Sequence, residues 1–226
     1  MTNNTTPHIA ITYDKSVRDT LPYYDLLMKE VIQVSKIIKP NATYWLDTGC
    51  GTGNLIDLAI KEFTHTQFMI TDPAQEMLDI AMAKNTDHTN VKALGTYTTQ
   101  QLSSINITRP EVISAIQCHH YLDWESRKKA LKVCFDLLPE GGLFVTSENI
   151  SPFTQDGIDY SKQKSIHFQM SNGRTLEEST AHSDRFGIHY FPITVEQYLL
   201  LLRGCGFKVV EILWSSNTLA GFYCIK

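Results

Sequence analysis

Residues 44–54, Tyr-Trp-Leu-Asp-Thr-Gly-Cys-Gly-Thr-Gly-Asn, constrain the fold of this chain more than any other stretch. The stretch begins apolar, passes through an aspartate and then has a glycine at every second position, Gly49, Gly51 and Gly53. Apolar residues at helical spacing follow over 55–60. The pattern predicts a buried strand, a tight glycine turn and a helix. Because glycine has no Cβ, such a turn can approach a ligand closely, and the helix N-terminus offers it free N–H groups.

An acidic residue follows the next predicted strand. Asp72 comes directly after the apolar run 68–71, about 20 residues beyond the glycines, where a Rossmann-like fold has the carboxylate that accepts hydrogen bonds from ribose hydroxyls. A helix-capping aspartate is the structural alternative. The two roles are compatible, and the spacing favours the ribose role.

The rest of the chain alternates between strand and helix patterns. Further strands are expected over 90–95, 111–116, 143–145, 207–214 and 219–225, and helices over 74–84, 125–138 and 193–203. This alternation predicts an α/β fold with a doubly wound, mostly parallel sheet. A chain of 226 residues with 42% hydrophobic content fits a single domain, residues 1–226, with one embellishment.

The segment from Asp47 to Gly53 resembles motif I, D-x-G-C-G-T-G, of the class I S-adenosyl-L-methionine (SAM) dependent methyltransferases. The resemblance implies a Rossmann-like seven-stranded sheet in the order 3-2-1-4-5-7-6, with strand 7 antiparallel. It also implies that the loop wraps the methionine half of SAM and that Asp47 helps to hold its ammonium group. Two alternatives stay open: a catalytically silent SAM-binding regulatory protein, and an NAD-linked oxidoreductase. Against the second, Asn54 stands where the NAD fingerprint has its third glycine.

Other segments resemble further motifs of the same family. Residues 72–78 resemble its second motif, and residues 114–122 resemble its motif IV. In this family the tyrosine of a Tyr-Asp pair before motif I often faces the cofactor, and here that pair is Tyr13 and Asp14. Relatives often carry an aspartate at position 96, where this chain has threonine. The expected cofactor-binding residues are therefore Tyr13, Asp47, Gly49, Cys50, Gly51, Gly53, Asn54, Asp72, Pro73, Met77, Thr96, Tyr97, Ala115 and Gln117.

Three residues are candidates for a catalytic general base. His119 and His120 follow the fourth predicted strand, and Glu148 follows the fifth, so all three lie where the methyl acceptor should sit. The resemblance implies methyl transfer from SAM to a small-molecule acceptor by in-line displacement, which needs a base only if the nucleophile arrives protonated. A structural role in supporting the loop is the alternative for His120.

Two segments are expected to cover the site. Residues 13–38 read as an N-terminal cap helix, and residues 151–191 as an insertion after the fifth strand that forms a substrate lid. The insertion is polar with scattered aromatic residues and no clear periodicity. It carries four cations that could form a local anion site: Lys162, Lys164, Arg174 and Arg185.

Charge and cysteine content limit the partners. The net charge is −4, and no basic run is present, so nucleic acid is not an expected partner. No stretch is long and apolar enough for a membrane span, and residues 1–6 do not read as a secretory signal. Five cysteines without C-x-x-C spacing favour reduced cytoplasmic thiols over a metal site. We expect a cytoplasmic monomer or homodimer that binds no metal.

Overall fold

The computed structural model describes residues 9–216 and 218–226, so the predicted absence of a signal in residues 1–6 lies outside the described residues. Its sheet has seven strands in the order β3-β2-β1-β4-β5-β7-β6, and β7 runs antiparallel to both of its neighbours. This confirms the predicted fold class and strand order. The strands are β1 (Tyr44–Thr48), β2 (Gln67–Thr71), β3 (Val91–Gly95), β4 (Val112–Ile116), β5 (Leu143–Asn149), β6 (Val209–Ser216) and β7 (Leu219–Ile225).

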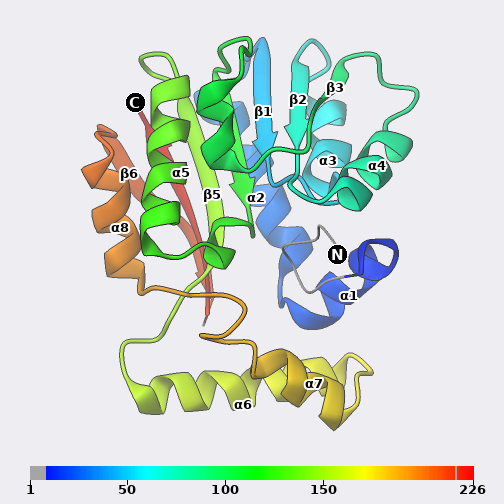
Figure 1. The fold of residues 1–226 in the computed structure, drawn as a ribbon, viewed down its shortest axis with the longest axis vertical. Coiled ribbons are helices and arrows are strands. Elements are labelled where there is room, and N and C mark those ends of the chain that lie inside the picture. The colour runs from blue at the N-terminus through cyan, green and yellow to red at the C-terminus, as the bar shows by residue number, and fades with distance from the viewer. Residues whose placement is uncertain (1–8, 217) are drawn as a thin grey trace.

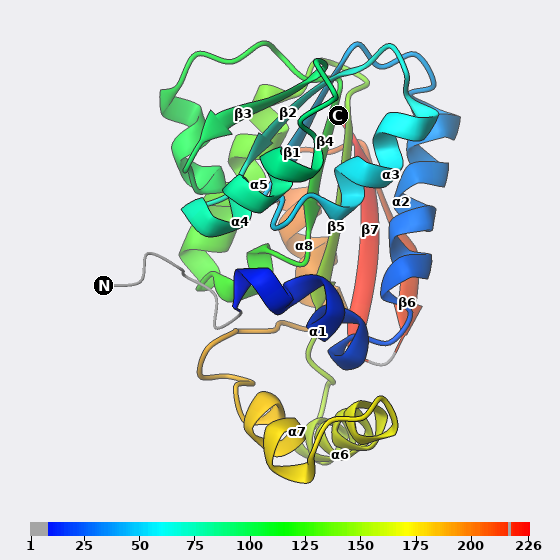
Figure 2. The same ribbon diagram turned by 90° about the vertical axis from the view of Figure 1, so that its right-hand side faces the viewer.

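Helices cover both faces of the sheet (Figures 1 and 2). On one face, α2 (Tyr24–Ile38), α3 (Asn54–Glu62) and α4 (Gln75–Lys84) share one apolar core with the strands. On the other face, α5 (Trp124–Leu137), α8 (Val195–Gly204) and the 3-10 helix η2 (Thr99–Ser104) share a second core. Because both faces are covered, the central strands are apolar on both sides rather than alternating. Among the described helices, none has the length and apolar character to cross a membrane.

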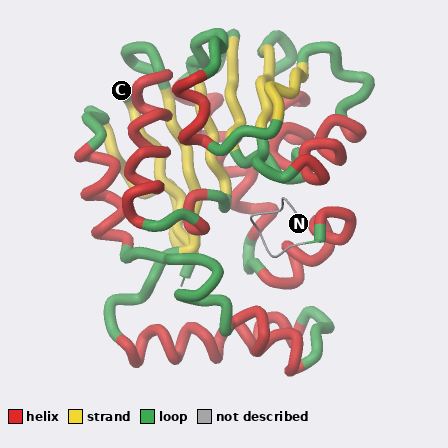
Figure 3. Tube along the Cα trace, in the orientation of Figure 1, coloured by secondary structure: helices red, strands yellow, loops and turns green. Residues whose placement is uncertain are grey.

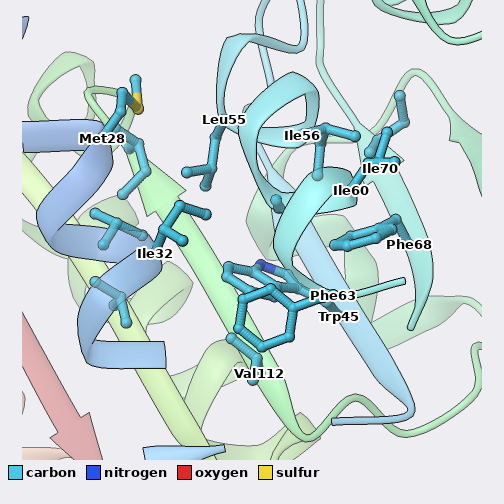
Figure 4. Packing of buried hydrophobic residues seen from close by; sticks show 14 of the residues in the cluster. Met28, Ile32, Trp45, Leu55, Ile56, Ile60, Phe63, Phe68, Ile70 and Val112 are labelled. Atoms are coloured by element: carbon cyan, nitrogen blue, oxygen red, sulfur yellow. The ribbon is translucent and has the colours of Figure 1, made fainter. Parts of the chain in front are cut away.

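Trp45 packs in the first core beside Phe63 (Figure 4). Its side chain is fully buried on β1, with its ring 5.1 Å from that of Phe63 and 5.9 Å from that of Phe68, centroid to centroid. Ile56 of α3 and Ile70 of β2 pack in the same cluster. Aromatic packing of this kind fixes α3 against β1 and β2, and therefore fixes the turn between them.

The N-terminal segment consists of two helices where the sequence predicted one over 13–38. Helix α1 (Tyr13–Thr20) follows a short 3-10 helix η1 (Ala10–Thr12), and the chain then turns before α2. Pro22 disfavours a helical conformation at the residue before it, and Tyr23 adopts a left-handed φ of +64°. The break lets α1 turn toward the carboxyl ends of the strands, where Figure 2 shows it.

The insertion is helical, although its sequence shows no clear periodicity. It contains α6 (Gln155–Ser171) and α7 (Leu176–Ser183), and Thr154 and Thr175 cap their N-termini through their side-chain oxygens. The two ends of the insertion are held together, since Ser151 N–H donates to the Ile193 carbonyl at 2.9 Å. Figures 1 and 3 show α6 and α7 beyond the carboxyl ends of the strands, and α6 packs against α1.

Candidate active site

The glycine turn between β1 and α3 has the backbone geometry that its sequence predicts. Gly49, Gly51 and Gly53 have φ angles of +66°, +54° and +83°, which favour glycine. At Gly49 space is a second constraint, because a Cβ there would lie 2.6 Å from the Cβ of Cys118. The turn therefore closes tightly against the segment after β4.

Asp72, just after β2, is held by two backbone N–H groups. Gly51 N–H donates to Oδ2 and Ala74 N–H donates to Oδ1, each at 2.9 Å. Burial raises the pKa of Asp72, and these two hydrogen bonds oppose the rise. The carboxylate lines a cavity of about 260 Å³, here called the cofactor cavity, which it shares with the glycine turn. The carboxylate of Asp72 thus both lines the cavity and braces the glycine turn.

Asp47 is the buried carboxylate at the end of β1, only 2% exposed, and it also lines the cofactor cavity. The Ser114 hydroxyl donates to its Oδ1 at 2.5 Å, and Trp45 Nε1 donates to the same hydroxyl at 2.8 Å. Burial raises the pKa of Asp47 to about 7, because the described lining of the cavity contains no lysine or arginine to compensate the charge. A ligand with an ammonium group would supply the missing positive charge.

Three buried polar atoms on the cofactor cavity lack a hydrogen-bond partner within the described part of the chain. They are the amide oxygens of Gln100 and Gln117 and Nδ1 of His119. Buried polar groups are rarely left unpaired in folded proteins. Unpaired atoms around a cavity therefore indicate groups that a polar ligand would satisfy.

Helix α1 is tied to the glycine turn through Asp14. Its carboxylate accepts from Thr52 Oγ1 at 2.5 Å and Asn54 Nδ2 at 2.9 Å, and it pairs with Lys84 Nζ at 2.6 Å. Partial burial raises the pKa of Asp14, but these three partners outweigh it and lower the pKa. The tie brings Tyr13 over the turn, 3.9 Å from the position of a Gly51 Cβ.

A second cavity of about 310 Å³, here called the acceptor cavity, adjoins the first. Tyr13, Gln117 and Tyr121 line both cavities. Gln117 has a left-handed φ of +56°, and its N–H donates to the Ser147 carbonyl at 2.7 Å. A strained non-glycine residue at this junction is the kind of feature that clusters at functional sites. The three residues define the point where two ligands would meet.

His120 lines the acceptor cavity and is oriented by Glu148. Glu148 Oε2 accepts from the His120 backbone N–H at 2.8 Å and lies 3.1 Å from His120 Nδ1, while Asn149 Nδ2 lies 3.2 Å from Nε2. Glu148 is fully buried and lines neither cavity. Burial raises the pKa of Glu148, but the hydrogen bond to His120 and the nearby charge of Arg127 outweigh burial. The pKa therefore lies below its usual value. Glu148 therefore contacts His120 rather than either cavity.

His119 faces the cofactor cavity instead. Its Nε2 lies 3.0 Å from Thr99 Oγ1, which lies 2.8 Å from Thr48 Oγ1. Burial lowers the pKa of His119 to about 4, so the ring is neutral at pH 7.

Arg127 of α5 is a buried cation that the sequence did not single out. Its guanidinium donates to the carbonyls of His119, Leu122 and Phe191 at 3.1, 3.1 and 2.5 Å, and lies 5.5 Å from the centre of the Tyr198 ring. These bonds join the loop that carries both histidines to the returning end of the insertion. On the sequence Arg127 looks like any surface cation of an amphipathic helix, so no local signal identified it.

The structure divides the predicted residues by location. Ten of the predicted cofactor residues line the cofactor cavity: Tyr13, Asp47, Gly49, Cys50, Gly51, Asn54, Asp72, Pro73, Met77 and Gln117. Four do not: Gly53, Thr96, Tyr97 and Ala115. A Cβ at Gly53 would face Ala81 of α4, and Ala115 is fully buried in the second core. Among the residues that the prediction missed, Tyr24, Thr99 and Gln100 line this cavity.

The four cations of the insertion are also divided. Lys162, Lys164 and Arg185 line the acceptor cavity. Arg174 lies in a separate shallow cleft between α1 and the α6–α7 connection, where its side chain bonds the Glu178 carbonyl.

Comparison with known proteins agrees with this geometry. Residues 46–144 match the family model described as "Methyltransferase domain". The carboxy-S-adenosyl-L-methionine synthase of Staphylococcus epidermidis is 23% identical to the chain, over 96% of this chain and 93% of that protein. The enzyme of the same name from Campylobacter lari is 22% identical, over 97% and 92%.

Solved structures share the fold. Magnesium protoporphyrin IX methyltransferase from Synechocystis PCC 6803, with bound S-adenosyl-L-homocysteine (SAH), has a TM-score of 0.65 at 12% identity, over 92% of this chain and 86% of that one. Human N-acetylserotonin methyltransferase in complex with SAM has a TM-score of 0.56 at 11% identity, and 95% of this chain covers 57% of that longer chain. Residues 46–144 thus match a methyltransferase domain, the described chain has the fold of solved SAM-dependent methyltransferases, and these findings support an enzyme that uses SAM.

Proposed function

We propose that this enzyme transfers the methyl group of SAM to a small-molecule acceptor. The observation that carries the proposal is the pair of cavities that meet at Tyr13, Gln117 and Tyr121. One cavity contains the acidic groups and the glycine turn, and the other contains a candidate base. A methyl donor and its acceptor must meet in this way for direct transfer.

The residues of the cofactor cavity fit SAM. Asp47, a buried carboxylate without a cationic partner in the described lining, would hold the ammonium group, and Asp72 would accept hydrogen bonds from the ribose hydroxyls. Gln100, with its unpaired amide oxygen, offers an acceptor for the adenine amino group.

The main contributions of the protein are to position the two reactants and to exclude water from the junction of the two cavities. SAM, when bound, supplies a methyl group already activated by its positive sulfur. The protein has to hold the nucleophile in line with that methyl group, and helices α1, α6 and α7 are our proposed lid over the junction.

His120 is our candidate for the base. A carboxylate can only accept, so in a neutral ring the bond to Glu148 requires Nδ1–H and leaves the lone pair on Nε2. An acceptor hydroxyl would have to replace Asn149 at Nε2, and both side chains face the acceptor cavity. We propose Glu148 as the positioning residue and His119, neutral and facing the cofactor, as a lining residue.

A second candidate function comes from the relatives named carboxy-S-adenosyl-L-methionine synthase. Their alignments extend over nearly the whole chain, including the insertion. By that name, the product is SAM that carries an added carboxyl group. In that case SAM would be the molecule that is carboxylated, and it would keep its methyl carbon. No SAH would therefore form.

Mass spectrometry of the products separates the two candidates. The protein is incubated with methyl-labelled SAM and a heat-inactivated cell extract that contains small metabolites, nucleic acids and proteins. Methyl transfer gives SAH and a labelled metabolite, whereas the second function gives a labelled, carboxylated SAM. The matched control is Gly51→Val, which introduces a β-branched residue at a left-handed φ and should prevent SAM binding. Neither product from wild-type protein, or label only in nucleic acid or protein, would overturn the proposal.

A further inference from the structure

The acceptor cavity has an unusual charge for this protein. Three cations line it, Lys162, Lys164 and Arg185, and no aspartate or glutamate does so among the described residues. The chain as a whole carries a net charge of −4. None of these three cations forms a salt bridge with a described carboxylate. The cavity therefore holds uncompensated positive charge that an anion would neutralise.

The cations lie among aromatic side chains. Lys162 Nζ lies 5.8 Å from the centre of the Phe186 ring, and this ring lies 5.8 Å from that of Tyr190 in an edge-to-face arrangement. Tyr190 in turn lies 5.9 Å from the ring of His120. A planar apolar group could pack here, with cations at one end and the candidate base at the other.

Arg185 is electrostatically connected to the junction of the two cavities. Burial raises the pKa of Tyr190 to about 12 and also raises that of Tyr121, and in both cases the positive charge of Arg185 opposes the rise. Tyr121 lines both cavities. Arg185 and Tyr121 therefore share the acceptor cavity and interact electrostatically across it.

We infer that the acceptor is a small acid, with a carboxylate or phosphate bound by Arg185 and Lys162 and a planar apolar body against Phe186 and Tyr190. This inference rests on the proposed function, because it identifies the substrate class of the same site. A cavity of about 310 Å³ suits a molecule of this size. Lys164, which is exposed, would contribute longer-range attraction.

The test compares acids with a neutral isostere. The probes are 4-hydroxybenzoate, phenyl phosphate and 4-hydroxybenzamide, titrated by ligand-observed NMR into the SAH-saturated protein. We expect at least one acid to bind about tenfold or more tightly than the amide. The acid that binds more tightly shows whether the site prefers a carboxylate or a phosphate. Arg185→Gln and Lys162→Met should each weaken its binding about tenfold, and Arg185→Lys by less. Arg203→Gln, an exposed arginine on α8, is the matched control and should change nothing.

Several results would overturn the inference: equal binding of acid and amide, no binding of either acid, or acid affinity that survives in folded Arg185→Gln protein. SAH affinity is measured separately by calorimetry on every variant. If SAH binds and methyl transfer occurs but the acids fail, only this inference falls. If the acids bind as expected but SAH does not, the proposed function falls and the anion site stands.

Discussion

Asp47→Asn should stabilise the ligand-free protein while it weakens SAM binding. Asp47 is 2% exposed, and no lysine or arginine lies on the described lining of its cavity. Asparagine has nearly the same shape and its amide oxygen can still accept from Ser114, so the substitution removes mainly the charge. A site built to bind an ammonium group is expected to be unfavourable for its own stability when empty.

The magnitude follows from the pKa of the carboxyl group. Burial raises it from 3.8 to about 7, which corresponds to roughly 4 kcal/mol of cost for the ionised form. Because the folded state binds the proton more tightly, the free energy of unfolding falls as pH rises from about 4 to 7 and stays low above 7. We therefore expect Asp47→Asn to gain about 2–4 kcal/mol at pH 8 and less than half of that at pH 5.

Urea unfolding at pH 5 and pH 8 measures this difference, and calorimetry with SAH measures binding. SAH affinity should fall by roughly 1.5–3 kcal/mol in Asp47→Asn, because a charge-assisted hydrogen bond is lost. Wild-type affinity should also weaken severalfold between pH 7.5 and 6, as Asp47 becomes protonated, and the variant should lack this dependence. Asp87→Asn, at an exposed aspartate, is the control.

The reasoning is refuted if Asp47→Asn is no more stable than wild type at pH 8, or if its gain is the same at pH 5. Unchanged SAH affinity in the variant would separately refute the proposed contact with the ammonium group.

Three further substitutions test other parts of the site. Asp72→Ala should weaken SAH binding by roughly 1.5–3 kcal/mol for each charge-assisted hydrogen bond lost; an unchanged dissociation constant by calorimetry would contradict the ribose role. His120→Gln should lower kcat about 10²-fold or more and leave SAH affinity unchanged; a variant that keeps the wild-type pH–rate profile would leave positioning alone as the mechanism. Arg127→Met should lower the free energy of unfolding by more than about 2 kcal/mol, since buried carbonyls lose their donor. An equal loss in the exposed control Arg203→Met would show that the buried position is not the cause.

Local patterns in the sequence were sufficient for the central sheet and for the glycine turn and the acid that line the cofactor cavity. The turn that begins at Gly49 and the acid at Asp72 both depend on short-range constraints, left-handed φ angles and the spacing of one βαβ unit, so they can be read from consecutive residues. The helix predicted over 193–203 is also present as α8, and a capping box of Thr194 and Gln197 marks its start.

The insertion was harder to interpret, because α6 and α7 have little apolar periodicity. Their helical conformation is marked mainly by the caps at Thr154 and Thr175, which a pattern search for buried faces overlooks. Residues 13–38 were predicted as one cap helix, whereas a break at Pro22 and Tyr23 divides them into α1 and α2.

The sequence by itself determined a SAM-type glycine turn on a doubly wound sheet, since hydrophobic periodicity and glycine spacing are local properties of the chain. Only the tertiary structure shows which polar residues are buried and which groups each of them contacts. Glu148 is buried behind His120, Arg127 binds three carbonyls, and the charge of Arg185 acts on Tyr121 in the loop after β4. Burial and charge partners are set by residues distant in sequence, and these place Asp47 and Asp72 on a cavity but Glu148 against a histidine.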